Sequence, residues 1–160
     1  MSRNLNSRQM EEGRKKPTAV IFDMDGTLAD VSSIRHHVRG ANRDFHRFHV
    51  ESAGVPPNQH VVEMARQAAV DGHHVAIVTA RRAKYRNHTA MWLALNGVPS
   101  HSLHMRADDD GRPDYEVKKD IHAKISREFN IVHAVDDNPS VIKLWQENNI
   151  PTTVVPGFED

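Results

Sequence analysis

The stretch TAVIFDMDGTL, residues 18–28, is mostly apolar in its first half and contains two aspartates in its second half. Its first five residues are apolar or β-branched, and they predict a strand that is buried on both faces. Asp23 and Asp25 follow at once, and Gly26 then allows the backbone a tight turn. Open parallel sheets bind ligands beyond the carboxyl ends of their strands, so a buried strand that ends in carboxylates indicates a site in such a sheet.

The rest of the chain alternates between strand and helix patterns. Apolar residues at helical spacing predict helices over 57–71, 84–95, 115–129 and 139–148. Short apolar runs predict further strands at 75–78, 102–105, 131–135 and 152–155. We therefore expect an α/β fold with three layers, a Rossmann-like and mainly parallel sheet with helices on both faces.

Two segments do not follow this alternation. Residues 1–16 are polar and lack apolar periodicity, so we expect a flexible polar tail in front of a single domain at 17–160. Residues 29–56 contain Phe45, Phe48 and several arginines and histidines. We expect a short helix and loop there that lie over the crevice, with a minimal cap or none.

Composition excludes several classes of protein. The formal net charge is zero, which gives no general sign of nucleic-acid binding. The chain has no cysteine, so disulfides and Cys-ligated zinc are excluded. No apolar run reaches the roughly 18 to 20 residues of a membrane span, and the N-terminus has no apolar signal segment. We expect a cytoplasmic protein without membrane contact, whose twelve scattered histidines lie mainly on the surface.

Polar clusters follow three of the predicted strands: Asp23 with Asp25, Thr79 with Arg81, and Asp136 with Asp137. Parallel strands end at the same edge of a sheet, so these clusters are expected to converge on one crevice. Four carboxylates placed together repel one another unless a cation lies between them. Their hard oxygen ligands suit Mg²⁺, which could hold a phosphate oxygen and neutralise charge during its transfer.

Such a crevice has the groups that phosphoryl transfer needs. One aspartate carboxylate can attack phosphorus, and a second carboxyl two residues on can protonate the leaving oxygen and then activate water. Gly26 would let amides face the phosphate, the Thr79 hydroxyl could donate to it, and Lys118 could pair with phosphate and nucleophile. Each feature alone is common in turns, caps and solvated helices, so only their combination indicates catalysis.

The same residues resemble the motifs of the haloacid-dehalogenase (HAD) superfamily in their family order. Asp23 to Leu28 resembles the first motif, Val78-Thr79 the second, Lys118 the third, and Asp136-Asp137 the fourth. The resemblance implies a phosphatase in which Asp23 is the nucleophile and carries a transient aspartyl-phosphate, and Asp25 is the general acid and base. It also implies Mg²⁺ held by Asp23, the backbone carbonyl of Asp25, Asp136 and Asp137. Response-regulator receivers have similar residues, but there the acidic pair comes first in the chain.

A narrower resemblance, over roughly residues 18–158, is to the 3′-phosphatase domain of phage polynucleotide kinase. The residues that carry it are Val20 to Ala29, Thr79 to Arg81, Thr89, Trp92-Leu93, Gly97 to Pro99, Met105-Arg106, Asp114 to Lys118, Ala134 to Asp137, Val141, Trp145 and Gly157-Phe158. It implies that Arg81, Arg106 and Asp114 join the site. Gly26, Thr27 and Ala80 are further expected substrate contacts, and Arg35 is a candidate phosphate contact.

The sequence departs from that phage domain in three respects. Residues 29–56 do not match it, and substrate choice is expected to depend on them. Thr79 and Ala80 stand where the phage enzyme has serine and glycine, although a threonine hydroxyl can donate the same hydrogen bond. The kinase half is missing, because no Gly-x-x-x-x-Gly-Lys-Ser/Thr phosphate loop occurs in these residues.

The resemblance implies a phosphomonoesterase that removes 3′-phosphates from polynucleotide ends, so its partner would be a phosphorylated nucleic-acid end. The alternative is a nucleotidase for small nucleoside monophosphates, with a base-stacking pocket supplied by Phe45, Phe48 or Tyr85. A non-catalytic interaction module conflicts with the intact acidic set. A mutase would need a cap to exclude water, and the chain has little room for one. No protein partner is indicated.

Overall fold

The computed structural model describes residues 16–158 and contains one five-stranded sheet in the order β3-β2-β1-β4-β5. All four pairings between neighbouring strands are parallel. The strands are β1 (Thr18–Phe22), β2 (His74–Arg82), β3 (Ser102–Arg106), β4 (Asn130–Asp136) and β5 (Thr152–Val154). The predicted tail lies outside the described residues except for Lys16, so its flexibility stays a prediction.

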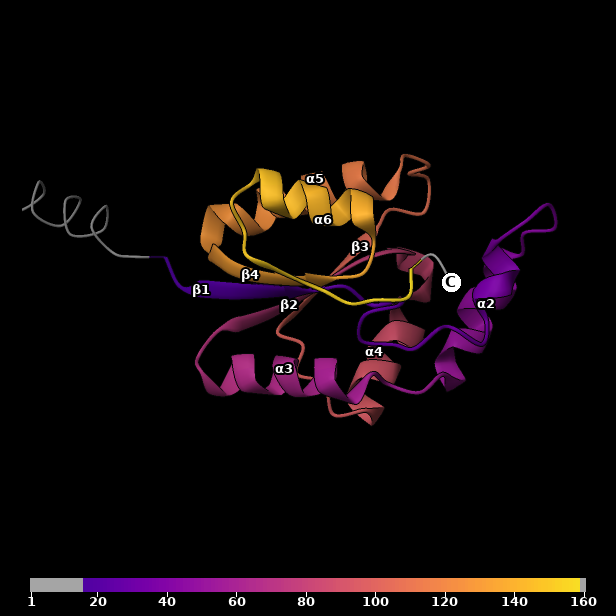
Figure 1. The fold of residues 1–160 in the computed structure, drawn as a ribbon, viewed down its shortest axis with the longest axis horizontal. Coiled ribbons are helices and arrows are strands. Elements are labelled where there is room, and N and C mark those ends of the chain that lie inside the picture. Colours follow the sequence, from indigo (N-terminus) through magenta and orange to yellow (C-terminus); the bar gives the residue numbers. More distant parts are fainter. Residues whose placement is uncertain (1–15, 159–160) are drawn as a thin grey trace, which may run out of the picture.

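Four helices cover the two faces of this sheet. They are α3 (Gln59–Val70), α4 (Arg86–Leu95), α5 (Asp114–Glu128) and α6 (Pro139–Glu147). Figure 1 shows α3 and α4 on one face, and α5 and α6 on the other. This arrangement confirms the predicted three-layer α/β fold.

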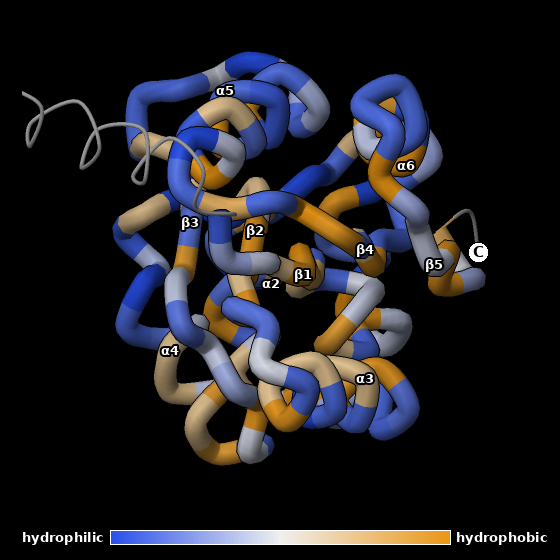
Figure 2. The backbone as a smooth tube through the Cα atoms, turned by 90° about the vertical axis from the view of Figure 1, so that its left-hand side faces the viewer, coloured by the Kyte–Doolittle hydropathy of each residue, from blue (hydrophilic) through white to orange (hydrophobic). Residues whose placement is uncertain are grey.

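The alternation of side chains along β1 explains why both faces are covered. Val20 and Phe22 belong to one apolar cluster with residues of α3 and α4. Ala19 and Ile21 belong to a second cluster with residues of α5 and α6. Successive strand residues point to opposite faces, so a wholly apolar strand needs helices on both sides. Figure 2 shows the apolar residues of β1, β2 and β4 gathered at the centre, between the helical layers.

The observed elements agree closely with the predicted ones, and β2 is the main exception. Its apolar run was predicted to end at Val78, but the strand continues to Arg82. Thr79 and Arg81 are buried in this extension, where hydrogen bonds to other polar groups satisfy them. A hydropathy pattern does not detect a buried strand whose residues are polar, because the pattern depends on apolar side chains.

Residues 29–56 form short helical turns beside the sheet. They contain two 3₁₀ turns, η1 (Arg35–Val38) and η2 (Ser52–Gly54), around the helix α2 (Phe45–Glu51). The side chain of Asp44 caps α2 by accepting a hydrogen bond from the amide of Arg47. Figure 1 shows α2 beyond the carboxyl end of β1. The short helix expected in this segment is therefore present.

None of the helices described here combines the length and the apolar character that crossing a membrane would need.

Candidate active site

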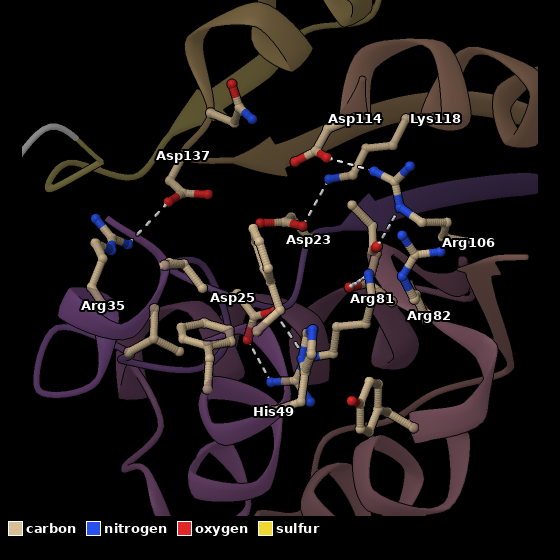
Figure 3. A pocket seen from close by; sticks show the side chains of 18 of the residues that line it. Asp23, Asp25, Arg35, His49, Arg81, Arg82, Arg106, Asp114, Lys118 and Asp137 are labelled. Atoms are coloured by element: carbon tan, nitrogen blue, oxygen red, sulfur yellow. Dashed lines mark hydrogen bonds and ion pairs between the residues drawn. The ribbon is translucent and has the colours of Figure 1, made fainter. Parts of the chain in front are cut away.

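A pocket of about 630 Å³ opens at the carboxyl ends of the central strands. Asp23 after β1, Thr79 to Arg82 of β2 and Asp137 after β4 line one part of it, together with Lys118 of α5. Residues of η1 and α2 line another part. Figure 3 shows Asp23 in the middle of this group, with Lys118 and Asp114 on one side of it and Asp25 with Arg81 on the other.

Three buried carboxylates meet at the floor of the pocket. One oxygen from each of Asp23, Asp136 and Asp137 lies within 4.8 Å of the others. Their meeting follows from strand pairing, because Phe22 of β1 lies beside Val135 of β4 and the Asp23 amide donates to the Val135 carbonyl at 3.0 Å. Residues more than a hundred positions apart are thus adjacent, as the sequence predicted.

Lys118 is the buried cation of this acidic cluster, and Arg35 lies at its edge, 3.5 Å from Asp137 Oδ2. The Nζ of Lys118 donates to Asp23 Oδ1 at 2.7 Å and to Asp136 Oδ2 at 3.0 Å. Burial alone would lower the pKa of Lys118, but Asp136 and Asp23 raise it above its usual value, so the amine stays charged. Burial and the neighbouring Asp136 nevertheless raise the pKa of Asp23 well above its usual value, although Lys118 opposes this shift. Lys118 and Arg35 together therefore do not offset three carboxylates, and the donor set fits an added divalent cation.

Asp136 differs from the other two acids in its hydrogen bonds. Its Oδ1 accepts from the amides of Asp137 at 2.9 Å and Asn138 at 3.1 Å. Its Oδ2 accepts from Lys118 and, at 3.3 Å, from the indole of Trp145. Asp136 is fully buried and does not line the pocket. Its carboxylate supplies negative charge and holds Lys118 and the following loop in place.

Substrate contacts of Gly26 and Thr27 stay a prediction. Neither residue lines the pocket, and their amides donate to the carbonyls of Ala29 and Met24 within the loop. The buried Thr27 hydroxyl lies 3.2 Å from both Asp23 Oδ2 and Asp137 Oδ1, where it can donate to either carboxylate and help to position it. Gly26 has φ +80°, and a Cβ there would lie 2.0 Å from Asp137 Oδ2. Glycine is needed because the carboxylate occupies the space of a side chain.

The structure corrects one expectation, that the Asp25 carboxylate belongs to the same group as the other three acids. The Asp25 side chain is not part of the acidic cluster. Arg81 holds it instead, by donating from Nε to Oδ2 at 2.8 Å and from Nη2 to Oδ1 at 2.5 Å. Burial would raise the pKa of Asp25, but the charge and hydrogen bonds of Arg81 outweigh it and lower the pKa. The buried Arg81 also donates to the Thr89 hydroxyl at 3.0 Å, and Thr89 donates to the Tyr85 carbonyl. Asp25 is therefore ionised and fixed in direction.

The remaining expected residues do line the pocket. Thr79 is buried there, and its hydroxyl accepts a hydrogen bond from the amide of Arg81. Arg106 donates to the Ala80 carbonyl at 2.9 Å and to Asp114 Oδ1 at 2.7 Å, which joins β3, β2 and α5 across the site. Arg35 lies 3.5 Å from Asp137 Oδ2 and also donates to the Gly157 carbonyl.

His49 and Lys84 also line the pocket, and the sequence did not single them out. The His49 ring lies 4.4 Å from the Tyr85 ring, and its buried Nδ1 has no hydrogen-bond partner among residues 16–158. Burial lowers the pKa of His49 to about 4, so the ring is neutral near pH 7. The available signal was the helical spacing of Phe45, Phe48 and His49, which places all three on the side of α2 that lines the pocket.

Comparison with known proteins identifies relatives of this chain. The family model of the polynucleotide kinase PNKP phosphatase domain matches residues 17–157. A protein of Autographa californica nuclear polyhedrosis virus, which carries the name bifunctional polynucleotide kinase/RNA ligase, is 31% identical over 144 residues. The match covers 88% of this chain and 19% of the viral protein.

Solved structures give the same result for the fold. A chain of the Pnkp1/Rnl/Hen1 RNA repair complex has a TM-score of 0.76 and 27% identity, over 88% of this chain and 42% of that chain. A class C acid phosphatase from Bacillus anthracis has a TM-score of 0.72 and 13% identity, over 97% and 73% of the two chains, and supports the fold alone. The chain spans less than half the length of the viral protein and of the repair-complex chain.

Proposed function

Because the chain belongs to the family of polynucleotide kinase PNKP phosphatase domains and is thus a HAD-type phosphatase, we propose that it removes 3′-phosphates from polynucleotide ends. One observation carries the proposal: a buried acidic cluster with its own lysine forms the floor of a pocket much larger than a phosphate group. The setting of a relative adds support, since the similar Pnkp1 chain was solved in an RNA repair complex.

Asp23 is the proposed nucleophile. It lines the pocket, whereas Asp136 lies behind it, and Lys118 and Thr27 fix the direction of its carboxylate. In the first step an Asp23 oxygen attacks phosphorus and the bond from phosphorus to O3′ breaks, which leaves phosphate on Asp23. The buried Thr79 hydroxyl and the Lys118 ammonium lie at the same floor, where they can hold the transferring phosphoryl oxygens.

Asp25 is the proposed general acid and base. It gives a proton to the departing O3′, and in the second step it takes a proton from the water that attacks the aspartyl-phosphate. Without substrate, Arg81 holds Asp25 ionised. Arg81 must therefore share its donors with the incoming phosphate, so that Asp25 can carry the proton for the first step.

The acidic cluster fits a magnesium ion. Asp23 and Asp137, with the backbone carbonyl of Asp25, would hold the ion. Each oxygen of Asp136 already accepts two hydrogen bonds, so this residue would contribute its negative charge and not a ligand atom. When bound, Mg²⁺ would hold a phosphate oxygen and offset the negative charge of the acids and the substrate.

The direct test compares phosphate release from a 3′-phosphorylated oligonucleotide with release from 3′- and 5′-mononucleotides in the presence of Mg²⁺. We expect the oligonucleotide to have the higher kcat/KM. An Asp23→Asn variant should retain the fold and lose at least about a thousand-fold in turnover, because an amide is not a nucleophile here. A large preference for mononucleotides would instead favour the nucleotidase. The aromatic residues that line the pocket are the observation that supports this alternative.

A further inference from the structure

The pocket has an aromatic wall that the phosphoryl-transfer chemistry does not use. Phe45, Phe48, His49 and Tyr85 line it from α2 and from the turn after β2. A volume of about 630 Å³ lies within the usual range for sites that enclose a whole small ligand. The wall therefore has room for the part of the substrate that carries the phosphate.

Phe45 is the exposed residue of this wall. Phe48, one helical turn further on, is buried in the apolar core, whereas the residue Phe45 is 55% exposed. Phe158, the other exposed phenylalanine of the pocket, has a partner, because the Arg35 guanidinium lies 5.9 Å from its ring. Within residues 16–158 no ring stacks on Phe45. An exposed aromatic face beside a catalytic floor is a suitable surface for a nucleobase.

Two cations lie beside this wall. The Lys84 ammonium lies 5.1 Å from the Tyr85 ring, and Arg82 donates to the carbonyls of Asp108 and Asp110. Neither forms an ion pair with a carboxylate of the described chain, in contrast to Arg106 and Arg112. The Tyr85 hydroxyl lies 2.8 Å from Nδ1 of His46, which connects the turn that bears Lys84 to the start of α2. The Lys84 amide donates to Asp108 Oδ1 at 2.8 Å, but the ammonium group itself has no carboxylate within ion-pair distance among residues 16–158.

We propose that Phe45 is a specificity residue that stacks on the terminal base of the substrate, while Lys84 contacts the next backbone phosphate. The proposal rests on the function proposed above, and it adds which parts of a polynucleotide end the protein recognises. In this arrangement the terminal phosphate lies at Asp23, its base lies against α2, and the preceding phosphate lies at the Lys84 side of the pocket. Recognition of the base then comes from the segment 29–56, which contains Phe45.

The test is a double-mutant cycle in which one change is made in the protein and the other in the substrate. Wild type and Phe45→Ala are compared on a 3′-phosphorylated oligonucleotide and on the same oligonucleotide with an abasic terminal residue. Removing the base should lower kcat/KM of the wild type about 5- to 100-fold, mostly through KM, because stacking on one aromatic side chain contributes on the order of 1–3 kcal/mol. Phe45→Ala should show a similar loss on the normal end and little further loss on the abasic end.

Matched variants separate stacking from folding. Phe45→Trp should keep the base effect and Phe45→Leu should lose most of it, since leucine is apolar but has no ring face. Val50→Ala changes an exposed apolar residue of the same helix that does not line the pocket, so it should match wild type on both ends. For the oligonucleotide, Lys84→Gln should reduce the slope of log kcat/KM against log salt concentration by about one. For a 3′-mononucleotide the slope should be the same as in wild type, because this substrate has no preceding phosphate.

The outcomes distinguish this proposal from the one that it rests on. If wild type releases phosphate from normal and abasic oligonucleotide ends equally well, the base subsite is refuted and the 3′-phosphatase stands. Equal losses for Phe45→Ala on both ends also refute it, because the residue would then act through the fold. If no 3′-phosphorylated oligonucleotide is hydrolysed while small phosphomonoesters are, the proposed function itself fails.

Discussion

At the scale of single residues, the largest constraint is the space that Gly26 leaves for Asp137. A Cβ at Gly26 would overlap Asp137 Oδ2 and would lie 2.6 Å from a nitrogen of Arg35. Gly26→Ala should therefore displace the Asp137 carboxylate and raise the Mg²⁺ concentration needed for half-maximal activity about 10- to 100-fold, as for other groups that orient metal ligands. A magnesium titration of activity measures this.

Gly72 provides the control for that substitution. It has a similar φ of +88°, but no atom lies within 4 Å of the Cβ that alanine would add. Gly72→Ala should cost about 1–2 kcal/mol of stability through backbone strain and leave the magnesium requirement unchanged. An equal magnesium effect in both variants would show that strain, and not the displaced carboxylate, is the cause.

Thr89 is a positioning residue for the pair of Arg81 and Asp25. Its hydroxyl accepts from Arg81 and donates to the Tyr85 carbonyl. Thr89→Val keeps the shape but leaves a buried guanidinium nitrogen without its acceptor, which costs about 1–3 kcal/mol. We expect kcat to fall about tenfold with little change in KM, and Thr89→Ser to restore it. A purely structural role would lower thermal stability without this split between kcat and KM.

At this scale the sequence predicted which side chains the fold brings together, and their roles in catalysis and binding stay proposals. The expected acids, Thr79, Lys118 and the arginines converge because parallel strands end at one edge. The wrong expectation, that the Asp25 carboxylate joins the acidic cluster, depends on hydrogen bonds between residues far apart in the chain. Asp25 and Arg81 are 56 positions apart. Residue spacing gives no information on which of several nearby partners a polar side chain selects.

At the scale of elements, the segment that follows α2 is anchored to α4. The indole of Trp92 donates to the Val55 carbonyl at 3.0 Å, just after η2. Trp92→Phe removes this bond, leaves a buried carbonyl unsatisfied, and should lower the free energy of unfolding by about 1–2 kcal/mol. Amides of residues 45–54 should then exchange hydrogen faster, while those of α6 keep their protection. Faster exchange throughout the chain would contradict a local anchor.

The boundaries of the elements show where a hydropathy pattern fails. β1 was predicted to its last residue because each of its positions is apolar or β-branched, whereas the polar half of β2 was missed. For α2, the sequence indicated a short helix but not that its side chains form a wall of the pocket. That depends on Tyr85, which belongs to a turn more than thirty positions away and contacts His46 and His49.

At the scale of the whole molecule, the acidic cluster opposes folding when no cation is present. Burial and Asp136 raise the pKa of Asp23 in the folded protein, so the contribution of Asp23 to stability is greatest below its unfolded pKa and falls as pH rises. In EDTA at neutral pH, Asp23→Asn should therefore unfold at a higher temperature than wild type, and the difference should shrink as pH falls toward 4. Thermal denaturation at several pH values measures it.

Magnesium should reverse this order. Binding to the folded state alone raises the stability of wild type with increasing Mg²⁺, and Asp23→Asn should gain less because it has lost a carboxylate ligand. A wild-type melting temperature that does not respond to Mg²⁺ would count against a cation in the cluster.

The same strand pairing that brings Asp23 to Asp137 also determines when the protein becomes active during folding. Lys118 meets Asp23 across 95 positions of sequence, and Arg81 meets Asp25 across 56. No single hairpin or helix pair contains these partners, so an intermediate that lacks part of the sheet would have no working site. Regain of turnover after dilution from denaturant should therefore coincide with the last and slowest phase of refolding, which makes catalysis a sensitive reporter of the complete topology.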